Sequence, residues 1–396
     1  MNMRGRLPDP EKQIVETADA ATEGMLLMKY TCQKSDLCEV LPNVAKAASA
    51  KTPMEALSAI CLRASGQELE LTGYDLELGI RTQIPAAVEE EGVVLTDSRL
   101  FSELVRRMPE GVLQIDIDDH LKITITGGGT SCQLPGMRAD EYPDLPDIEQ
   151  EQGAVIPQSL LKNMIDQTIY AVSLDETKPI FTGELIEMAD DALNIVALDN
   201  YRMALRTEPL PGQEPMKFVV PAKALREIEH LLGDDEKNEN PCKIRLDQHH
   251  AMFEIGHYIV YTRLLAGDFI NYRRSIPENA KTEVTLSRRE LMDSLERCGL
   301  LISEKNKTAV RFQFEEDRVL ISCQNVVGSV DDQIPCDMTG EKMVIGFNNR
   351  YLLDAVRAVQ SDRVRLFLTA ADRAVKVMEA DGDGSVAIIM PVQVRR

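Results

Sequence analysis

Three basic residues stand at matching places in this chain of 396 residues, each two positions ahead of an apolar residue in an amphipathic stretch. They are Arg99 before Phe101, Lys223 before Leu225, and Arg350 before Leu352. Cationic side chains of this kind bind anions such as phosphate groups. On a single helix, a solvated face would explain the charge equally well. The repetition favours a shared anionic partner.

Other residue types that carry chemistry lack the spacing of a catalytic or metal site. The eight cysteines form no C-x-x-C pair, and the five histidines show no metal or triad spacing. The run Gly127–Gly129 precedes no Lys-Ser or Lys-Thr pair, and Asp381–Gly384 reads as a turn. We therefore expect no metal, no cofactor and no catalytic residue, with free and mostly buried thiols in a reducing cytoplasm.

An acidic pair that includes Asp199 leaves a hydrolase open as an alternative from another class. The matching position of an earlier copy of the same pattern holds Tyr74, which is not an acid. A hydrolase also gives no reason for cations at three matching places. Binding is therefore the favoured class of function.

The cations belong to a longer unit that occurs three times. Gln83-Ile84-Pro85 returns as Gln333-Ile334-Pro335, and Arg81-Thr82 returns as Arg206-Thr207. A repeat of about 125 residues is a whole small domain, larger than the repeat of a solenoid. Proline-containing connectors at 134–146 and 265–277 separate the copies. The predicted organisation is a loose polar extension over 1–24, followed by domains at 25–147, 148–276 and 277–396.

Each copy is predicted to contain two helices and several short strands, which makes an α+β unit. Asp97, Pro221 and Asn348 begin the second helix of the three copies. Pro42 is an anomaly, because a proline two turns into a helix should kink it. The helical stretches are expected at 36–48, 98–108, 158–173, 222–232, 287–302 and 349–360.

The charge is distributed unevenly. The chain carries a net charge of -21, whereas the six helical stretches hold twelve Lys or Arg residues against ten Asp or Glu. Such an acidic protein cannot coat nucleic acid in general, because phosphates would be repelled at long range. No apolar run reaches the length of a membrane span, so we expect no membrane partner.

Several segments closely resemble one family over roughly residues 25–396. They are Ile345–Ala355 (IGFNNRYLLDA), Ile388–Val392, Phe269–Pro277, Ser303–Lys307, and Leu134–Gly136 with Tyr142–Leu145. The family is the bacterial DNA polymerase III beta subunit, the sliding clamp that acts as a processivity factor in DNA replication.

The resemblance implies three clamp domains and a head-to-tail homodimer that closes a ring around duplex DNA, helices inside. Twelve helices side by side at about 8 to 10 Å would leave a hole on the order of 25 Å. A ring needs only weak positive charge inside, which agrees with the charge distribution. The implied partners are duplex DNA, a second identical chain, the DNA polymerase III alpha subunit, the clamp loader, and other DNA polymerases and repair proteins. The implied protein is not an enzyme.

The resemblance also implies three sets of site residues. A pocket between the second and third domains would bind a short, partly apolar peptide through Phe181, Leu198, Asn200, Tyr201, Arg202, Met203, Ile270, Arg274, Ser275, Asn348, Tyr351, Met390, Pro391 and Val392. Together with the cations of the helices, the DNA-facing set is Lys46, Lys51, Arg99, Arg106, Lys178, Lys223, Arg226, Arg350 and Arg357. The dimer seam would bring Cys132 and Leu134 against Leu301 and Ile302 of the second chain.

Alternatives remain for each set. Without the resemblance, Met203, Ile270 and Met390 would be assigned to the core, the lysines to solvent, and the seam residues to ordinary buried positions. Many family members have Thr-Asp-Gly-His-Arg-Leu where Leu198–Met203 stands here, so the peptide preference is open. A clamp paralogue serving repair or inhibitor resistance also fits this sequence.

Overall fold

The computed structural model of the chain describes residues 28–49, 52, 54–146, 148, 152–234, 240–303 and 308–394. The expected extension at 1–24 and Lys51 lie outside these described residues. The chain divides into two compact units. The first comprises Met1–Asp147 with His257–Tyr261, and the second comprises Ile148–Gly256 with Thr262–Arg396.

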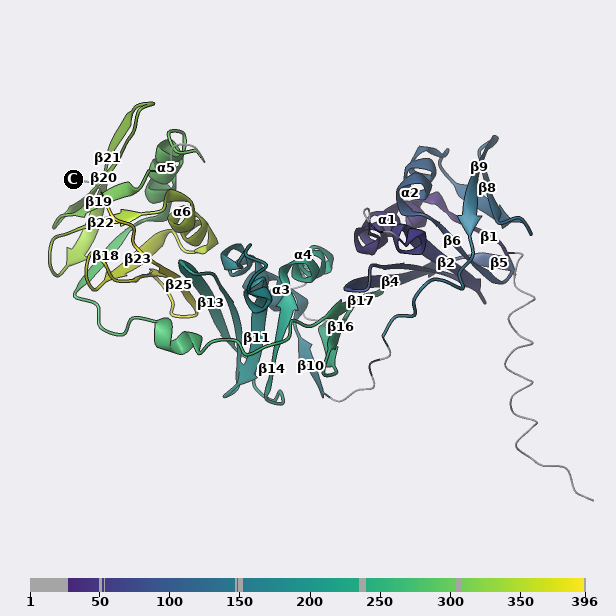
Figure 1. Cartoon of the computed structure of the whole chain (residues 1–396), viewed down its shortest axis with the longest axis horizontal. Helices are drawn as coiled ribbons and strands as arrows, with labels where there is room; N and C mark the ends of the chain where they lie inside the picture. Colours follow the sequence, from purple (N-terminus) through teal and green to yellow (C-terminus); the bar gives the residue numbers. More distant parts are fainter. Residues whose placement is uncertain are drawn as a thin grey trace, which may run out of the picture. The chain divides into compact units, whose positions relative to one another are not determined.

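The first unit packs two helices on antiparallel strands (Figure 1). Its helical elements are α1 (Lys34–Val44), η2 (Ala45–Ala47), η3 (Glu55–Ser58) and α2 (Ser98–Arg107). Its strands are β1 (Met28–Gln33), β2 (Ala59–Ser65), β3 (Glu68–Tyr74), β4 (Leu78–Pro85), β5 (Ala87–Glu90), β6 (Gly92–Asp97), β7 (Val112–Ile117), β8 (Lys122–Gly127) and β9 (Thr130–Met137). Within the sheet they run in the order β4-β3-β2-β6-β9-β8-β7-β1-β5. Leu37 and Leu41 of α1 and Phe101 and Val105 of α2 are buried, as the helical spacing of the apolar residues predicts.

The second unit contains two further copies of this arrangement. Its helical elements are α3 (Gln158–Asp166), η4 (Ile169–Ala171), η5 (Pro179–Phe181), α4 (Ala222–Leu231), η6 (Tyr272–Ser275), α5 (Arg288–Gly299) and α6 (Asn349–Ala358). The strands of its first copy are β10 (Gln152–Ile156), β11 (Gly183–Ala189), β12 (Ala192–Leu198), β13 (Arg202–Pro209), β14 (Met216–Pro221), β15 (Cys242–Leu246), β16 (His250–Ile255) and β17 (Tyr258–Arg263). Most residues of β17 group with the first unit. Those of its second copy are β18 (Thr282–Ser287), β19 (Val310–Phe314), β20 (Arg318–Gln324), β21 (Ser329–Thr339), β22 (Met343–Phe347), β23 (Arg363–Leu368), β24 (Val375–Glu379) and β25 (Ser385–Ile389).

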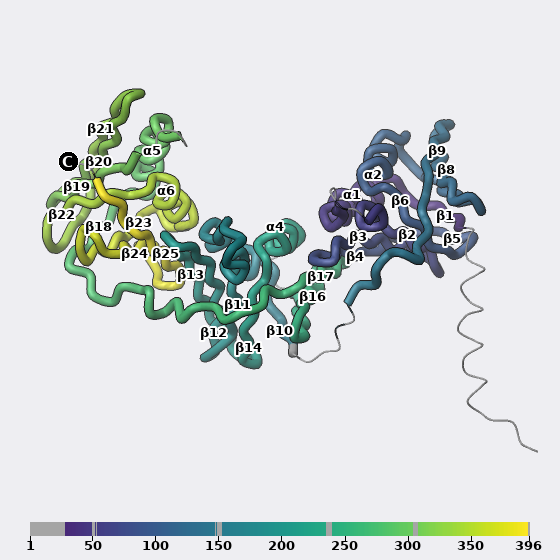
Figure 2. Tube along the Cα trace, in the orientation of Figure 1, coloured from purple at the N-terminus to yellow at the C-terminus, as the bar shows by residue number. Residues whose placement is uncertain are grey.

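One antiparallel sheet joins the two copies of the second unit. Its order is β14-β11-β12-β13-β25-β24-β23-β18-β21-β20-β19-β22, so β13 of one copy pairs directly with β25 of the next. Figure 2 shows the helices of each copy as neighbours, α5 beside α6 and, in the first unit, α1 beside α2. The predicted α+β class and the three copies of helices packed on antiparallel strands are confirmed.

The three second helices, α2, α4 and α6, are equivalent in length as well as in sequence. Each has ten residues and starts at the expected position. The Asp97 carboxylate accepts the Leu100 N–H, and the Asn348 side chain accepts the Arg350 and Tyr351 N–H groups. These side chains satisfy N–H groups that the first turn of a helix otherwise leaves unpaired.

Three expectations of the fold need correction. The helical stretch predicted at 158–173 is interrupted, because α3 ends at Asp166 and only the 3-10 turn η4 follows. The connector predicted to begin at residue 134 begins later, because Leu134 to Met137 continue strand β9. No break in α1 follows Pro42, and the helix continues to Val44 before it changes to the 3-10 turn η2. The proline lies near the end of the helix, where its missing N–H removes only one bond of the last turn.

The first residue of each first helix ties that helix to the end of the second. Lys34 Nζ donates to Glu110 Oε1 at 2.6 Å, and the Gly233 N–H just after α4 donates to Gln158 Oε1 at 2.8 Å. Arg288 Nε donates to the carbonyl oxygen of Val356 at 3.0 Å. The same tie is made by three different side chains, so its place in the fold is kept while its chemistry varies.

Among the described residues, no group of three His, Cys, Asp or Glu side chains is placed to hold a metal ion. No described helix is long and apolar enough to cross a membrane. All eight cysteines are free thiols, and six of them are buried, as predicted. Burial raises the pKa of the Cys32 thiol to about 12, so this thiol remains protonated at neutral pH.

Glu184 is an acid in a position that is apolar in the other two copies. In the strand register, Glu184 lies opposite Val220, two residues before α4. The residues opposite the matching positions before α2 and α6 are Ile60 and Val310. All three side chains are fully buried. The hydroxyl of the nearby Thr168 donates to the carbonyl oxygen of Met164, and neither carboxyl oxygen of Glu184 has a hydrogen-bond partner among the described residues. Burial raises the pKa of Glu184 from its ordinary 4.5 to about 8.

Replacing Glu184 with valine, the residue of the third copy, should stabilise the protein, and more so as the pH rises. Between about pH 4.5 and 8, the unfolded chain has lost the Glu184 proton while the folded chain keeps it, so stability falls with rising pH. Valine does not titrate, so this pH-dependent loss of stability is absent from the variant. We expect the difference in melting temperature between E184V and the unaltered chain to grow by several degrees from pH 5 to pH 8. A constant difference over this range would contradict the assignment.

Candidate functional site

Two strands from different copies bring the predicted pocket residues together. In the pairing of β13 with β25, Arg202 lies opposite Ile389 and Met203 lies opposite Ile388. Beyond the strand, the Met390 N–H donates to the carbonyl oxygen of Tyr201 at 2.8 Å. The chain then turns towards β22, where the Val392 N–H donates to the carbonyl oxygen of Gly346 at 2.9 Å. The two copies thus supply adjacent parts of one surface.

This surface has a buried apolar floor and an exposed apolar rim. Leu198 and Met203 belong to a buried cluster with Ile388 and Phe269, against which Phe181 packs. The rings of Phe181 and Phe269 meet edge to face at 5.6 Å. By contrast, 44% of Ile270 and 42% of Met390 are exposed. The alternative assignment to the core is therefore right for Met203 and wrong for Ile270 and Met390.

Arg202 joins the two copies through a nearly buried ionic network. Its Nη1 donates to Asp354 Oδ2 at 2.6 Å and its Nε to Asp199 Oδ2 at 3.1 Å, with only 8% of the side chain exposed. Its guanidinium carbon lies 4.5 Å from the ring centre of Tyr351 and 5.6 Å from that of Tyr170. Asp199 and Asp354 are both engaged by Arg202, which fixes α6 against the end of β12 and the start of β13.

Tyr201 adds an aromatic wall beside this network. Its ring stacks on that of Tyr351 at 6.2 Å, with 24° between the planes, and 56% of the residue is exposed. The Asn348 oxygen is committed to capping α6. Asn200, Arg274 and Ser275 are exposed, so their polar groups are accessible to a ligand.

The sequence did not reveal the residues that hold Arg202. Asp354 is 152 positions away from Arg202, and no pattern along the chain links them. Tyr170 lies in η4 and likewise carries no local signal. The only sequence hint was that Asp354 follows Arg350 by four residues, a spacing that allows an ion pair, and those charges lie 3.9 Å apart.

The recurring cations occupy one equivalent position. Arg99, Lys223 and Arg350 are each the second residue of their helix, and all three are exposed. A cation there opposes the helix dipole and costs about 0.3 to 1 kcal/mol per helix. Three repetitions of an unfavourable placement point to a role other than stability.

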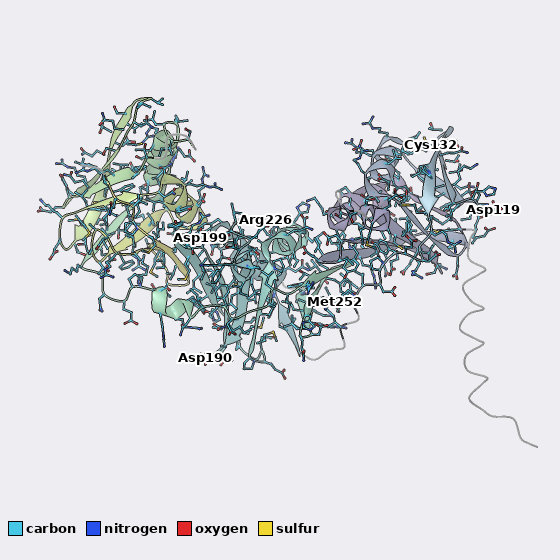
Figure 3. All side chains as sticks on the ribbon, viewed as in Figure 1. Asp119, Cys132, Asp190, Asp199, Arg226 and Met252 are labelled. Carbon is cyan, nitrogen blue, oxygen red and sulfur yellow. The ribbon has the colours of Figure 1, made fainter. Side chains whose placement is uncertain are left out.

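The other predicted cations that the structure describes are exposed as well. Lys46 lies on η2, Lys178 lies just before η5, and Arg226, labelled in Figure 3, lies on α4. Arg106 pairs with Glu103 on its own helix, whereas Arg357 donates to Glu296 of α5 at 2.7 Å. The latter two cations are therefore partly neutralised.

The predicted seam residues lie in two places, within strand β9 and just after helix α5. Cys132, labelled in Figure 3, is half-buried on β9, and Leu301 and Ile302 are half-buried after α5. Leu134 is only 3% exposed within its own unit, so it has little surface left for a partner. Among the described strands, no neighbour other than β8 pairs with β9 from Thr130 to Pro135.

Comparisons with known proteins agree with this arrangement of three copies. Family models of the DNA polymerase III beta subunit match its N-terminal domain at residues 28–146, its central domain at 155–271 and its C-terminal domain at 273–393. The beta sliding clamp of Bacillus subtilis (strain 168) is 31% identical over 379 residues, covering 92% of this chain and 100% of that protein. The one from Halalkalibacterium halodurans is 29% identical over 381 residues, covering 92% and 100%.

Solved structures lead to the same class. The DNA polymerase sliding clamp from Bacillus subtilis matches with a TM-score of 0.89 at 30% identity, covering 93% of this chain and 100% of that one. A sliding clamp from Pseudomonas aeruginosa bound to griselimycin matches with a TM-score of 0.86 at 26% identity, covering 93% and 100%. By fold, the chain is a sliding clamp. It belongs to the DNA polymerase III beta subunit family.

Proposed function

We propose that two copies of this chain form a head-to-tail ring around duplex DNA and tether the replicative polymerase to it, conferring processivity. The observation that carries the proposal is the cation at the second position of α2, α4 and α6. Each copy offers one exposed positive charge in a helix position that disfavours it, in a chain whose net charge is -21. Weak contacts of this kind hold phosphates without stopping movement along them.

The pocket around Met390 is the proposed docking site for partner peptides. Exposed apolar side chains at its rim, a buried floor and accessible polar groups at Arg274 and Ser275 are what a short, partly apolar segment requires. The proposed partners are the DNA polymerase III alpha subunit, the clamp loader, and other DNA polymerases and repair proteins. Binding of the cell's own alpha-subunit segment would favour this role over that of a paralogue.

The proposed ring closes where strand β9 of one chain meets the third domain of another. Thr130–Pro135 of β9 and Ser329–Pro335 of β21 have no strand partner on one side in the described structure. Unpaired strand edges bind other strands readily. Nearby Leu300 is 84% exposed, which supplies apolar surface for the same contact.

A hydrolase is less well supported. Asp199 accepts the Tyr201 and Arg202 N–H groups as well as Arg202 Nε, and Asp354 accepts Arg202 Nη1. Both carboxylates therefore have a structural role in joining the copies. We propose that the chain acts without catalysis of its own.

The decisive experiment measures retention on DNA. Chain loaded by the clamp loader onto closed circular duplex should remain bound through gel filtration in moderate salt. Cutting the circle once should release it, because a ring slides off a free end. Equal release from intact and cut circles would overturn the ring, and a monomeric mass at micromolar concentration would overturn the dimer.

Replacing Arg99, Lys223 and Arg350 with glutamine should weaken the contact with DNA without opening the ring. Two chains lose six cations, so the plot of log affinity against log salt for linear duplex should become shallower by up to about 5 units. Retention on closed circles should persist. As a control, Arg63, Lys243 and Arg363, exposed cations on one strand of each copy, should be replaceable with no change in this slope. An unchanged slope in the helix variant would exclude these residues from the DNA contact.

A further inference from the structure

The groove between α1 and α2 in the first copy holds a cavity of about 590 Å³. One wall is apolar, formed by Leu41, Pro42, Ala45 and Ala48. The opposite wall is polar and includes Ser98, Arg99, Ser102 and Arg106 of α2. The volume lies in the range of sites that hold small organic ligands.

The third copy closes the equivalent groove with an ion pair. Glu296 is the ninth residue of α5, as Pro42 is of α1, and Arg357 is the ninth residue of α6, as Arg106 is of α2. Arg357 Nη2 donates to Glu296 Oε1 across the two helices at 2.7 Å. Pro42 offers no carboxylate, and Arg106 turns to Glu103 on its own helix at 2.7 and 2.8 Å. The proline thus leaves the first groove unbridged.

The second copy fills its groove with larger side chains. Ala45 begins the 3-10 turn η2, and the equivalent first residue of η4 is Ile169. Ala48 follows η2, and the equivalent residue after η4 is Val172, which is buried. The first copy therefore lacks the carboxylate that bridges the third groove at Glu296, and it has Ala45 and Ala48 where the second copy has the larger Ile169 and Val172.

The charges around the cavity favour an anion. Among the described residues, Arg99 has neither an ion pair nor a hydrogen bond. The acids of the lining are already engaged, since Asp97 caps the Leu100 N–H and Glu103 binds both Arg106 and Arg107. The hydroxyl of Ser102 donates to the carbonyl oxygen of Ser98, which leaves its oxygen free to accept. Arg99 is therefore the charge most available to a ligand.

We propose that the α1–α2 groove of the first copy binds a small organic anion with a compact apolar body. The apolar body lies on Leu41, Pro42, Ala45 and Ala48, and the anionic group is held by Arg99. This site is separate from the pocket around Met390 and does not depend on the chain's forming a ring.

The probe is 8-anilinonaphthalene-1-sulfonate, an aromatic sulfonate whose fluorescence rises in an apolar site, titrated into the full chain. We expect one saturable site per chain. Pro42→Glu supplies the carboxylate that bridges the groove in the third copy, and Ala45→Ile supplies the larger side chain of the second copy. Each substitution should weaken dye binding at least tenfold. Arg99→Ala should weaken dye binding several-fold, while Arg350→Ala, the equivalent change in the third copy, should leave dye binding unchanged.

Cys38 provides an independent test of location. It lines the cavity, and besides Cys132 it is the only cysteine that is not buried. In a chain carrying Cys132→Ser, saturating dye should slow the reaction of Cys38 with a thiol reagent. Circular dichroism and melting temperature check that each variant is folded. Equal dye binding by the unaltered chain, P42E and A45I would overturn the proposal, as would absence of a saturable site or unchanged reactivity of Cys38.

Discussion

Replacing Met390 with glutamate should weaken binding of the alpha-subunit segment by more than 100-fold. Met390 lies at the rim of the proposed pocket with 42% of its surface exposed, held by the bond from its N–H to Tyr201. A bound apolar segment would cover this side chain, and covering a carboxylate without a partner is costly. A loss of about 2.7 kcal/mol corresponds to the 100-fold effect. Fluorescence anisotropy of a labelled peptide, titrated with the full chain, measures it.

A matched control separates the pocket from a general effect of charge. Val344 on β22 is an apolar residue of the same domain with 40% exposure. Val344→Glu should bind the peptide as the unaltered chain does, and both variants should keep the native melting temperature within a few degrees. If M390E binds normally, the peptide site lies elsewhere. If V344E loses binding equally, the loss comes from the added charge and the pocket assignment fails.

Local signals predicted the helices well because their causes are local. Asp97 and Asn348 cap their helices through side-chain oxygens three or fewer residues from the N–H groups they accept. The burial of Phe101 follows from its spacing to Val105 on one helix face. Comparing three copies strengthened these signals, since a feature seen at Arg99, Lys223 and Arg350 is less easily due to chance.

The parts that sequence could not predict depend on contacts between distant segments. The bond from Arg202 to Asp354 forms only because β13 and β25 pair and bring α6 close. Glu184 gave no sign of burial, since an acid on a strand is usually solvated. Its apolar equivalents, Ile60 and Val310, could be identified only after strand register aligned the copies. The exposure of Met390 required the same knowledge, because Ile388 and Ile389 just before it are buried.

Replacing Leu301 and Ile302 together with aspartate should convert the proposed dimer into monomers and abolish retention on closed circular DNA. Both residues follow α5 next to exposed Leu300, and the Leu301 carbonyl accepts Asn325 Nδ2 at 2.6 Å from the β20–β21 turn. A ring has two seams, so four carboxylates would enter apolar contacts. We expect the dimer dissociation constant to rise more than about 1000-fold, or about 4 kcal/mol.

Analytical ultracentrifugation would measure the dimer, and peptide binding would serve as the check on folding. Because Leu301 and Ile302 also pack on the core of the third domain, a variant that retains peptide affinity but loses the dimer isolates the seam. Leu174→Asp, a charge placed on an 81% exposed leucine of the second domain, should leave both properties intact. If the double variant remains a dimer, the seam is formed by other residues. A monomer that stays on intact circles would contradict the ring itself, because topological retention requires a closed boundary around the DNA.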